Sequence, residues 1–217
     1  MPLRRDEVIE AGIKLLDEVG LDDMTTRRLA ERLGVRVGAL YWHVASKQEL
    51  LDNIADRIAR EAMAEPLPTG DWEEQVRGLA YRLRAAMLSH RDGARLLAAG
   101  PSPLSIDSLA FIDRLIGALR SGGASLHAAA YGADTIVSYV TGFTLQEQHM
   151  QQADLPEEEH DGELGESLAQ TLDPAMMPNL VDWAPHLSLD REPPFAAGID
   201  VIINGLRAEL ATSSNTS

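Results

Sequence analysis

Residues 25–44 read TTRRLAERLGVRVGALYWHV, and residues 46–51 continue SKQELL. Leu29 and Leu33 recur at the spacing of one helix face, and Gly34 follows where helices commonly end in a residue that tolerates positive φ. A second short helix is expected after this glycine. Two such helices joined by a turn form a helix-turn-helix, so the stretch predicts an all-α protein that binds DNA.

The second helix is the predicted reading helix. Leu40 and Val44 lie four residues apart and are expected to face inward. The other faces of this helix can meet a DNA groove, and they carry Val37, Ala39, Tyr41 and His43. Trp42 is expected to pack beneath the helix, since a large aromatic side chain gains from burial. Ser46 with Glu49 three residues later is a capping-box pattern and predicts a further helix leading into the rest of the chain.

The net charge of −15 is unusual for a protein that meets DNA, so its distribution matters. Residues 1–60 hold ten basic and eleven acidic side chains, whereas the remainder holds nine and 23. The acidic excess therefore belongs to the second part of the chain. Local cationic groups govern phosphate contacts, because screening acts over about 8 to 10 Å at ordinary salt. The basic residues available for such a surface are Arg4, Arg5, Arg27, Arg28, Arg36 and Lys47.

Composition favours a cytoplasmic protein. The chain of 217 residues has no cysteine for disulfides or thiolate metal sites and no run of about 18 apolar residues for a membrane span. Its first residues lack the apolar stretch of a secretory signal. We expect no catalytic site, cofactor or bound metal, because the sequence shows no phosphate-binding glycine loop and no metal-spaced histidine pair.

The chain divides into three predicted parts. Residues 1–64 form the helix-turn-helix domain, residues 65–211 form a larger helical domain, and residues 212–217 form a disordered tail. The first boundary is the proline- and glycine-containing stretch 65–70, after which Asp71 and Glu74 predict a helix start. The acidic stretch 154–166 is expected to be a loop, and apolar helical stretches are expected at 175–183 and 195–210.

The motifs also resemble those of a known family. Residues 39–44, which end in Tyr41-Trp42-His43-Val44, and the stretch 86–94 are similar to the TetR family, in particular to its tetracycline-repressor subgroup. The resemblance covers most of the chain and is weakest at 154–193. It implies an all-helical fold, with a small DNA-binding domain and a larger domain that binds an effector and dimerises.

The resemblance assigns DNA contacts only where positions match. These are Thr26 and Arg27 on the first helix of the motif, and Tyr41, His43 and Lys47 on and after the second. From their chemistry alone, Arg36 and Arg27 are the only candidates for a bidentate base contact. The tetracycline repressors carry a polar residue, a proline and a threonine where this chain has Val37, Gly38 and Ala39, so their operator sequence does not transfer. Val37 and Ala39 could instead meet thymine methyl groups.

The predicted effector pocket is mainly apolar. By local alignment, Leu97 stands where the tetracycline repressors carry a metal-binding histidine, and Pro101 where they carry an arginine. A hard cation needs oxygen or imidazole ligands, so tetracycline with magnesium is rejected as the effector. An apolar or aromatic ligand is expected instead, unless the same side chains simply fill a core. The predicted lining residues are Met63, Leu79, Leu83, Leu97, Tyr131, Ser138, Tyr139, Phe143, Gln146 and His149.

The expected assembly is a homodimer on a palindromic operator, with reading helices about 34 to 36 Å apart. The stretches 175–183 and 195–210 are the predicted dimer surface, unless they close the core of one chain. Two other functions remain as alternatives. One is control by a protein partner or without any ligand, and the other is a small metal-dependent hydrolase using Glu159, His160, His149 and His186, although no nucleophile and base stand at suitable spacing.

Overall fold

The computed structural model describes residues 3–67, 69–99, 106–152, 161–187 and 190–214. Across these ranges the chain is helical and contains no strand, as the sequence predicts. The helices are α1 (Arg5–Asp23), α2 (Thr26–Leu33), α3 (Val37–Leu40), α4 (Lys47–Glu61), α5 (Trp72–Leu88), α6 (Gly93–Ala98), α7 (Ile106–Ser121), α8 (Leu126–Gln152), α9 (Asp161–Thr171), α10 (Pro178–Trp183), a short 3₁₀ turn (Ala184–His186) and α11 (Glu192–Ser214).

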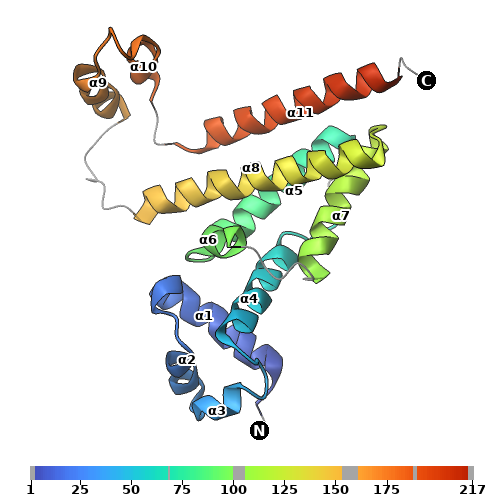
Figure 1. The fold of residues 1–217 in the computed structure, drawn as a ribbon, viewed down its shortest axis with the longest axis vertical. Coiled ribbons are helices and arrows are strands. Elements are labelled where there is room, and N and C mark those ends of the chain that lie inside the picture. Colours follow the sequence, from blue (N-terminus) through green and yellow to red (C-terminus); the bar gives the residue numbers. More distant parts are fainter. Residues whose placement is uncertain (1–2, 68, 100–105, 153–160, 188–189, 215–217) are drawn as a thin grey trace.

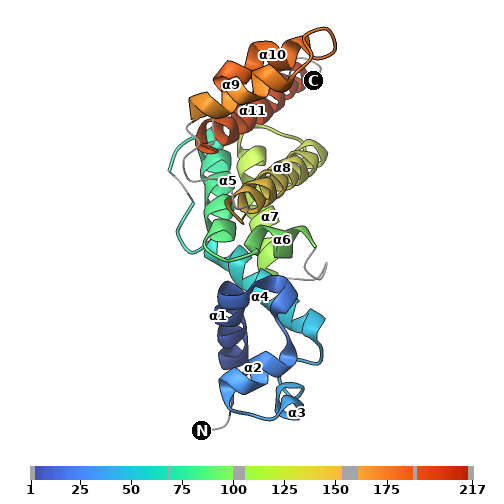
Figure 2. The ribbon, with the colours of Figure 1, turned by 90° about the vertical axis from the view of Figure 1, so that its left-hand side faces the viewer.

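The molecule is elongated, with α1 to α3 at one end and α9 to α11 at the other (Figures 1 and 2). Helix α4 leads from the first end into the body, where it packs against α5, α6 and α7. Helices α7 and α8 pack against each other, and α8 also packs on α5 and α6. The core runs through both parts, from Leu16 and Leu29 near the end to Leu79, Leu115 and Val140 in the body, all fully buried.

The local signals at helix starts are confirmed. The Asp71 carboxylate accepts from the Glu73 and Glu74 amides, while Glu74 accepts from the Asp71 amide, which completes the predicted capping box. The Ser125 hydroxyl likewise accepts from the Ala128 amide at the start of α8. Side-chain caps satisfy amides that have no partner inside the helix, so these residues fix where each helix begins.

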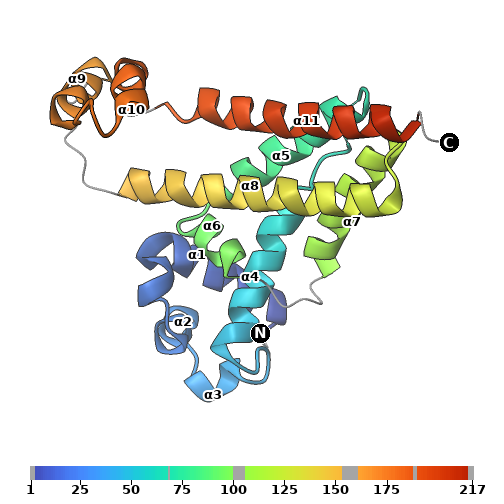
Figure 3. The same ribbon diagram turned by 45° about the horizontal axis from the view of Figure 1, so that its top comes forward.

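Helix α11 lies along α8 on the outside of the body (Figures 1 and 3). Gly198 permits the close approach, because a Cβ there would lie 2.0 Å from the Tyr139 hydroxyl. That hydroxyl donates to the carbonyl oxygens of Pro194 and Phe195 at 3.2 and 3.1 Å. Phe195 itself is fully buried and packs edge-on against Tyr81 of α5. The start of α11 is therefore anchored to both α5 and α8.

Helices α9 and α10 project sideways from the body (Figure 3). They pack on each other and on the 3₁₀ turn, where Gly165 fits closely against the Ala184 carbonyl. This unit exposes several apolar side chains, namely Met176, Met177, Leu180 and Trp183. Such a group of exposed apolar side chains commonly marks an interaction surface.

Two expectations about helix ends are corrected. The sequence predicts a loop at 154–166, but residues 161–166 begin α9, and residues 154–160 lie outside the described part. It predicts a tail from residue 212, but α11 continues to Ser214, and residues 215–217 lie outside the described part. Helix α1 breaks at Gly20, with φ of 77°, and resumes for one more turn to Asp23.

Polar contacts join α1 to the turn between α5 and α6. The amide of Leu21, which follows the break in α1, donates to the Asp92 carboxylate at 2.8 Å. Asp22 forms a bidentate ion pair with Arg95 at 2.7 and 2.8 Å. Asp92 is buried and adopts φ of 58°, which side-chain-bearing residues seldom do. The end of α1 is therefore held on the body by specific contacts.

Candidate functional site

Residues 25–47, which include the predicted reading helix and are called the reading segment below, form a compact unit. The Thr25 hydroxyl caps α2 by accepting from the Arg28 amide at 3.2 Å, and Gly34 ends the helix with φ of 67°. The Val35 amide then donates a hydrogen bond to the Ala30 carbonyl oxygen, which fixes the turn. The second helix, α3, contains only Val37–Leu40 and continues as a turn through residues 41–43, so it is shorter than predicted.

The aromatic residues after α3 face outward. Leu40 and Val44 are buried, as their spacing predicts, and they fill the contact with the neighbouring helices. Tyr41 is half exposed, and Trp42 is 89% exposed. The expectation that Trp42 packs beneath the helix is wrong, because α3 ends before it and the buried positions on either side are already taken by the two aliphatic side chains. Both aromatic side chains are therefore available to a ligand outside the protein.

Two cations in this segment form no ion pair within the described part of the chain, Arg36 at the start of α3 and Lys47 at the start of α4. Arg27 instead pairs with Glu31 at 3.1 Å across one exposed helix turn. The predicted DNA-contacting residues all lie on α2, on α3 and the turn after it, or at the start of α4, which together form one end of the molecule (Figure 2): Thr26, Arg27, Arg36, Val37, Gly38, Ala39, Tyr41, Trp42, His43 and Lys47.

A second candidate site is an apolar hollow of about 150 Å³ inside the body. Side chains from five helices, α4 to α8, line it. Ser108 and Thr141 contribute hydroxyl groups, and the rest of the wall is aliphatic or aromatic. The lining residues are Ala59, Leu83, Leu97, Ser108, Phe111, Ile112, Val137 and Thr141. A wall of this kind, with few polar groups, is typical of a site for a mainly apolar small molecule.

The sequence identifies only part of this wall. Leu83 and Leu97 line the hollow, but the other eight predicted residues do not. On the outer face of α8, Tyr131, Ser138, Gln146 and His149 are exposed, because the face of α8 turned to the hollow is the one that carries Val137 and Thr141. The remaining four lie elsewhere: Met63 borders a separate surface hollow, Leu79 is fully buried, Tyr139 stacks on Phe195, and Phe143 packs edge-on against Phe195.

The missed lining residues share a pattern that the sequence does contain. Ser108, Phe111 and Ile112 are three or four residues apart on α7, and Val137 and Thr141 are four apart on α8, so each set forms one face of its helix. The signal that could have found them is the pair of faces that α7 and α8 turn toward each other. Which helix faces which is set by tertiary packing, and a single helix pattern does not carry it.

A buried ion network lies between α5, α8 and α11. The Arg84 guanidinium donates to both Glu147 carboxylate oxygens at 2.9 and 2.8 Å, and its third nitrogen donates to Glu192. Hydrogen bonds to these carboxylates raise the pKa of Arg84, so it remains a cation. The guanidinium also lies 4.6 Å from the centre of the Phe195 ring. All three of its nitrogens have partners, so this network holds the three helices together.

No metal site accompanies the hollow. Among the described residues, no cluster of three or more histidine, cysteine or acidic side chains could hold a metal ion. Leu97 contributes an aliphatic side chain to the wall, which offers a metal ion no ligand. Pro101, Glu159 and His160, named in the sequence predictions, lie outside the described part. His186 ends the 3₁₀ turn on the projecting unit, while His149 lies on α8.

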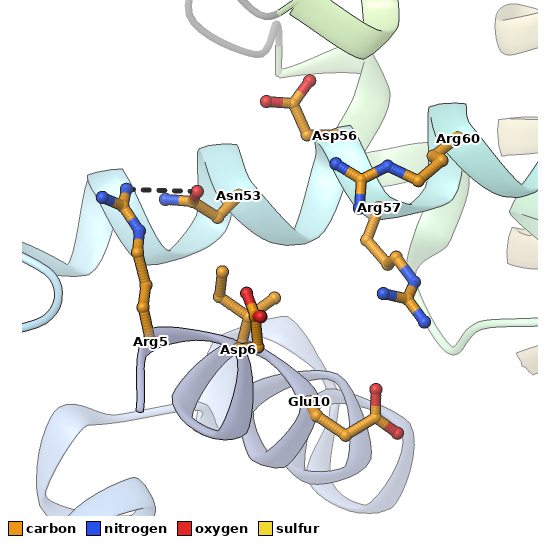
Figure 4. A pocket seen from close by; sticks show the side chains of 8 residues that line it. Arg5, Asp6, Glu10, Asn53, Asp56, Arg57 and Arg60 are labelled. Carbon is orange, nitrogen blue, oxygen red and sulfur yellow. Dashed lines mark hydrogen bonds between the residues drawn. The ribbon is translucent and has the colours of Figure 1, made fainter. Parts of the chain in front are cut away.

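Figure 4 shows a polar hollow between α1 and α4. Arginine and acidic side chains line it together, and Arg5 bridges the two helices through Asn53 and Glu49. Burial raises the pKa of Asp56, with a further contribution from Asp107. Because opposite charges compensate one another here, the hollow offers no net charge that would recruit a particular ligand.

Comparisons with known proteins decide the family. Residues 8–54 match the family of bacterial regulatory proteins, tetR family, and residues 65–210 match the tetracycline repressor-like C-terminal domain. The chain belongs to the TetR family. This TetR protein is 34% identical to the class C tetracycline repressor of Escherichia coli, across 98% of this chain and 94% of that repressor. Its N-terminal helices are thus a DNA-binding domain, and the larger helical part is a ligand-binding domain.

Solved structures agree with this assignment. The apo structure of ActR from Streptomyces coelicolor superposes with a TM-score of 0.83, at 34% identity, and covers 98% of this chain and 99% of ActR. ActR in complex with actinorhodin matches equally well, with 97% of this chain covered. The protein is therefore a ligand-responsive DNA-binding regulator of transcription, as the helix-turn-helix and the two-part organisation predict.

Proposed function

We propose that this TetR protein is a repressor that binds a palindromic operator as a homodimer and is released by a mainly apolar small molecule. Residues 1–64 are the DNA-binding unit, and residues 65–211 are the unit that binds the effector and dimerises. The observation that carries the proposal is the position of α4, which reaches both sites. Lys47 begins this helix at the end of the reading segment, and Ala59 near its end lines the apolar hollow.

The two ends of α4 are mechanically connected. Lys47 and Ala59 are separated by about 18 Å along a continuous helix. A helix moves as a rigid element, so a ligand that displaces the Ala59 end also turns the Lys47 end. If the two reading segments of a dimer must fit successive major grooves, a small change of angle weakens binding. Coupling of about 1 to 3 kcal/mol changes operator affinity by about 5- to 150-fold.

The wall of the hollow indicates the chemistry of the effector. Burial of apolar ligand surface contributes about 25 cal/mol for each Å². Ser108 and Thr141 can orient one oxygen or nitrogen atom of the ligand by hydrogen bonding. A magnesium–drug complex would meet Leu97 instead of an imidazole, and each polar group that loses its water without a new partner costs roughly 1 to 3 kcal/mol. The effector is therefore apolar or aromatic, and its binding needs no metal.

The same proposal describes a cytoplasmic protein without catalytic activity or a cofactor. The relatives it matches are regulatory proteins. No helix in the described part of the chain is both long and apolar enough to cross a membrane. Activity against a substrate would need a nucleophile or base aimed into a cavity, and none of the described residues that line the apolar hollow is a histidine or carries a carboxylate.

We expect Lys47→Ala to weaken binding to all DNA sequences and Arg36→Ala to weaken the selectivity among sequences. Lys47 lies at the start of α4, where an ammonium group contacts phosphate, so its loss weakens binding to every sequence and reduces the salt slope by about one unit. Arg36 begins α3, and its loss relaxes selectivity at one base pair, at about 1 to 3 kcal/mol. Both are measured by titration against a duplex selected from a random pool and against random DNA. Equal losses on both duplexes for Arg36→Ala would show that Arg36 reads no base.

The proposed dimer surface centres on α11. Phe195, Ile199 and Ile203 are buried against the body, which leaves the opposite face of the helix outward. That face is exposed and made of small or apolar residues at intervals of three or four: Pro194, Ala197, Val201, Gly205 and Ala208. Small side chains let a second helix approach closely. Together with the exposed apolar side chains of α10, this face suits a second copy of the chain.

Val201→Glu is expected to prevent dimerisation without disturbing the fold of one chain. Val201 is 71% exposed, so the carboxylate remains hydrated in a monomer but is buried and unpaired in the dimer. The dimer dissociation constant should rise at least about 100-fold, measured by sedimentation. The matched control is Ile106→Glu on α7, which is 75% exposed and should stay dimeric. A Val201→Glu protein that remains dimeric and keeps its operator affinity would exclude this face as the interface.

A further inference from the structure

His90 occupies the junction between the DNA-binding domain and the body. It lies in the turn between α5 and α6, and its side chain is only 11% exposed. Its Nδ1 lies 3.2 Å from both carboxylate oxygens of Asp17 on α1. Its Nε2 lies 3.0 Å from the Glu61 carboxylate at the end of α4. One imidazole ring thus connects the body to α1 and α4, the first and last helices of the DNA-binding domain.

The two contacts require a proton on each ring nitrogen. An ionised carboxylate only accepts hydrogen bonds, and a neutral imidazole has a single N–H. Only the imidazolium form can donate to Asp17 and Glu61 at once. In the neutral form, one ring nitrogen would turn its lone pair toward a carboxylate at hydrogen-bonding distance, which is repulsive. The geometry shown is therefore that of protonated His90.

The surrounding charges also favour the cation. Asp17 additionally accepts from the Arg91 amide at 3.1 Å, and Glu61 also pairs with Arg57 at 3.6 Å. Gln148 of α8 is uncharged and donates to the His90 carbonyl. The charged groups that meet the ring are Asp17 of α1 and Glu61 of α4. Around them lie Arg57 of α4, which pairs with Glu61, Arg91 of the same turn as His90, and the Glu65–Arg82 pair between the end of α4 and α5, which borders the same surface hollow as Glu61.

We propose that His90 is a proton-operated latch that holds α4 of the DNA-binding domain against the body. When His90 is protonated, the ring bonds both α1 and α4. When it loses the proton, the tautomer with hydrogen on Nδ1 keeps its bond to Asp17, and the contact with Glu61 is lost. Helix α4 then loses its bond to the turn between α5 and α6, although it still packs on the body and Arg60 still pairs with Asp107 of α7. Helix α1 stays attached through Asp92 and Arg95.

The direction of the pH effect follows from the contacts. Burial lowers the pKa of His90, but the hydrogen bonds and charges of Glu61 and Asp17 outweigh it, so the pKa lies above its usual value. A raised pKa means that protonation favours the latched arrangement. The latch is therefore closed at pH values below the usual pKa of histidine, and it opens as the pH rises through the raised value. A rise of the pH through the pKa of His90 therefore weakens the coupling of α4 to the body.

The test measures the position of α4 against the body in the full-length protein. The chain has no cysteine, so spin labels can be placed at two exposed sites, Gln48→Cys at the start of α4 and Arg120→Cys at the end of α7. Labelled chain is mixed with a large excess of unlabelled chain, so that each assembly holds one labelled copy. Pulsed electron resonance then gives one intramolecular distance distribution between pH 5.5 and 8.5. The inference assumes the proposed coupling through α4, but this distance is measured without DNA or effector, so the latch can fail while the proposed function stands.

We expect a narrow distribution at pH 5.5 that broadens or shifts as the pH rises. His90→Gln should remove this pH dependence, and the matched control His127→Gln, an exposed histidine of α8, should keep it. Glu61→Gln removes one stabilising charge, so it should lower the midpoint by at least about half a pH unit, even if His90→Gln folds poorly. An unchanged distribution in the wild type across this range, a pH dependence that persists in His90→Gln, or an unshifted midpoint in Glu61→Gln would each overturn the latch.

Discussion

Arg84→Met is expected to destabilise the protein by about 3 to 5 kcal/mol, the largest loss of stability we predict for any single substitution. Arg84 and Glu147 are almost fully buried, with side chains 11% and 6% exposed. Replacement of the guanidinium leaves the Glu147 carboxylate in the core without its two donors. The unfolded chain hydrates this charge freely, so the cost falls on the folded state alone. The measurement is the free energy of unfolding in urea.

The matched control removes both charges. Arg84→Met combined with Glu147→Leu leaves no unpaired ion, and replacing a buried ion pair with apolar side chains of similar size is often neutral or stabilising. We expect the double variant to recover most of the stability lost in the single one. A single variant within about 1 kcal/mol of the wild type, or a double variant as unstable as the single one, would show that the network does not hold α5, α8 and α11 together as described.

Val137→Trp is expected to lower the affinity for the effector at least about 100-fold, or about 2.7 kcal/mol, while operator affinity stays within about twofold. Val137 is half buried and lines the hollow from α8. A large side chain there occupies the space of about 150 Å³ that the ligand needs. The readout is operator release by whichever hydrophobic compound releases the wild-type protein.

Two further variants separate occupation of the hollow from other effects. Gln151→Trp adds the same side chain at an exposed position near the end of α8 and should leave the response unchanged. Thr141→Val keeps the shape of the wall but removes a hydroxyl, so it should cost one hydrogen bond, about 0.5 to 1.5 kcal/mol. A full effector response in Val137→Trp would place the effector outside this hollow.

The sequence predicts the parts of the fold that depend on neighbouring residues. The cap at Asp71 and the glycine turn at Gly34 are interactions within one helix turn, so their residue types determine them. Helix α9 escapes prediction because its sequence has few apolar residues. The length of α3 is not predicted, because the helix propensities of its residues do not specify where so short a helix ends.

In the candidate sites, too, the sequence predicts what depends on neighbouring residues and misses what depends on tertiary packing. The reading segment is continuous in sequence, so the order of its residues along the chain is enough to identify them. The position of Trp42 is predicted wrongly because burial depends on which neighbours occupy the core, and Leu40 and Val44 already do. The wall of the hollow combines five helices, and its residues on α7 and α8 are recognised only once the two helices are packed together. His90 likewise has partners 29 and 73 positions away, which no local pattern links.

The central claim is that an apolar molecule controls operator binding without a metal. The measurement is release of a selected operator duplex by the full-length protein, titrated with tetracycline plus magnesium and with a panel of hydrophobic aromatic compounds, each with and without a chelator. We predict release by at least one hydrophobic compound, unaffected by the chelator, and no release by tetracycline. The account would be contradicted if tetracycline with magnesium released the operator, none of the hydrophobic compounds did, and the chelator abolished that release. Such a result would require a metal ion in the pocket, where Leu97 offers no ligand.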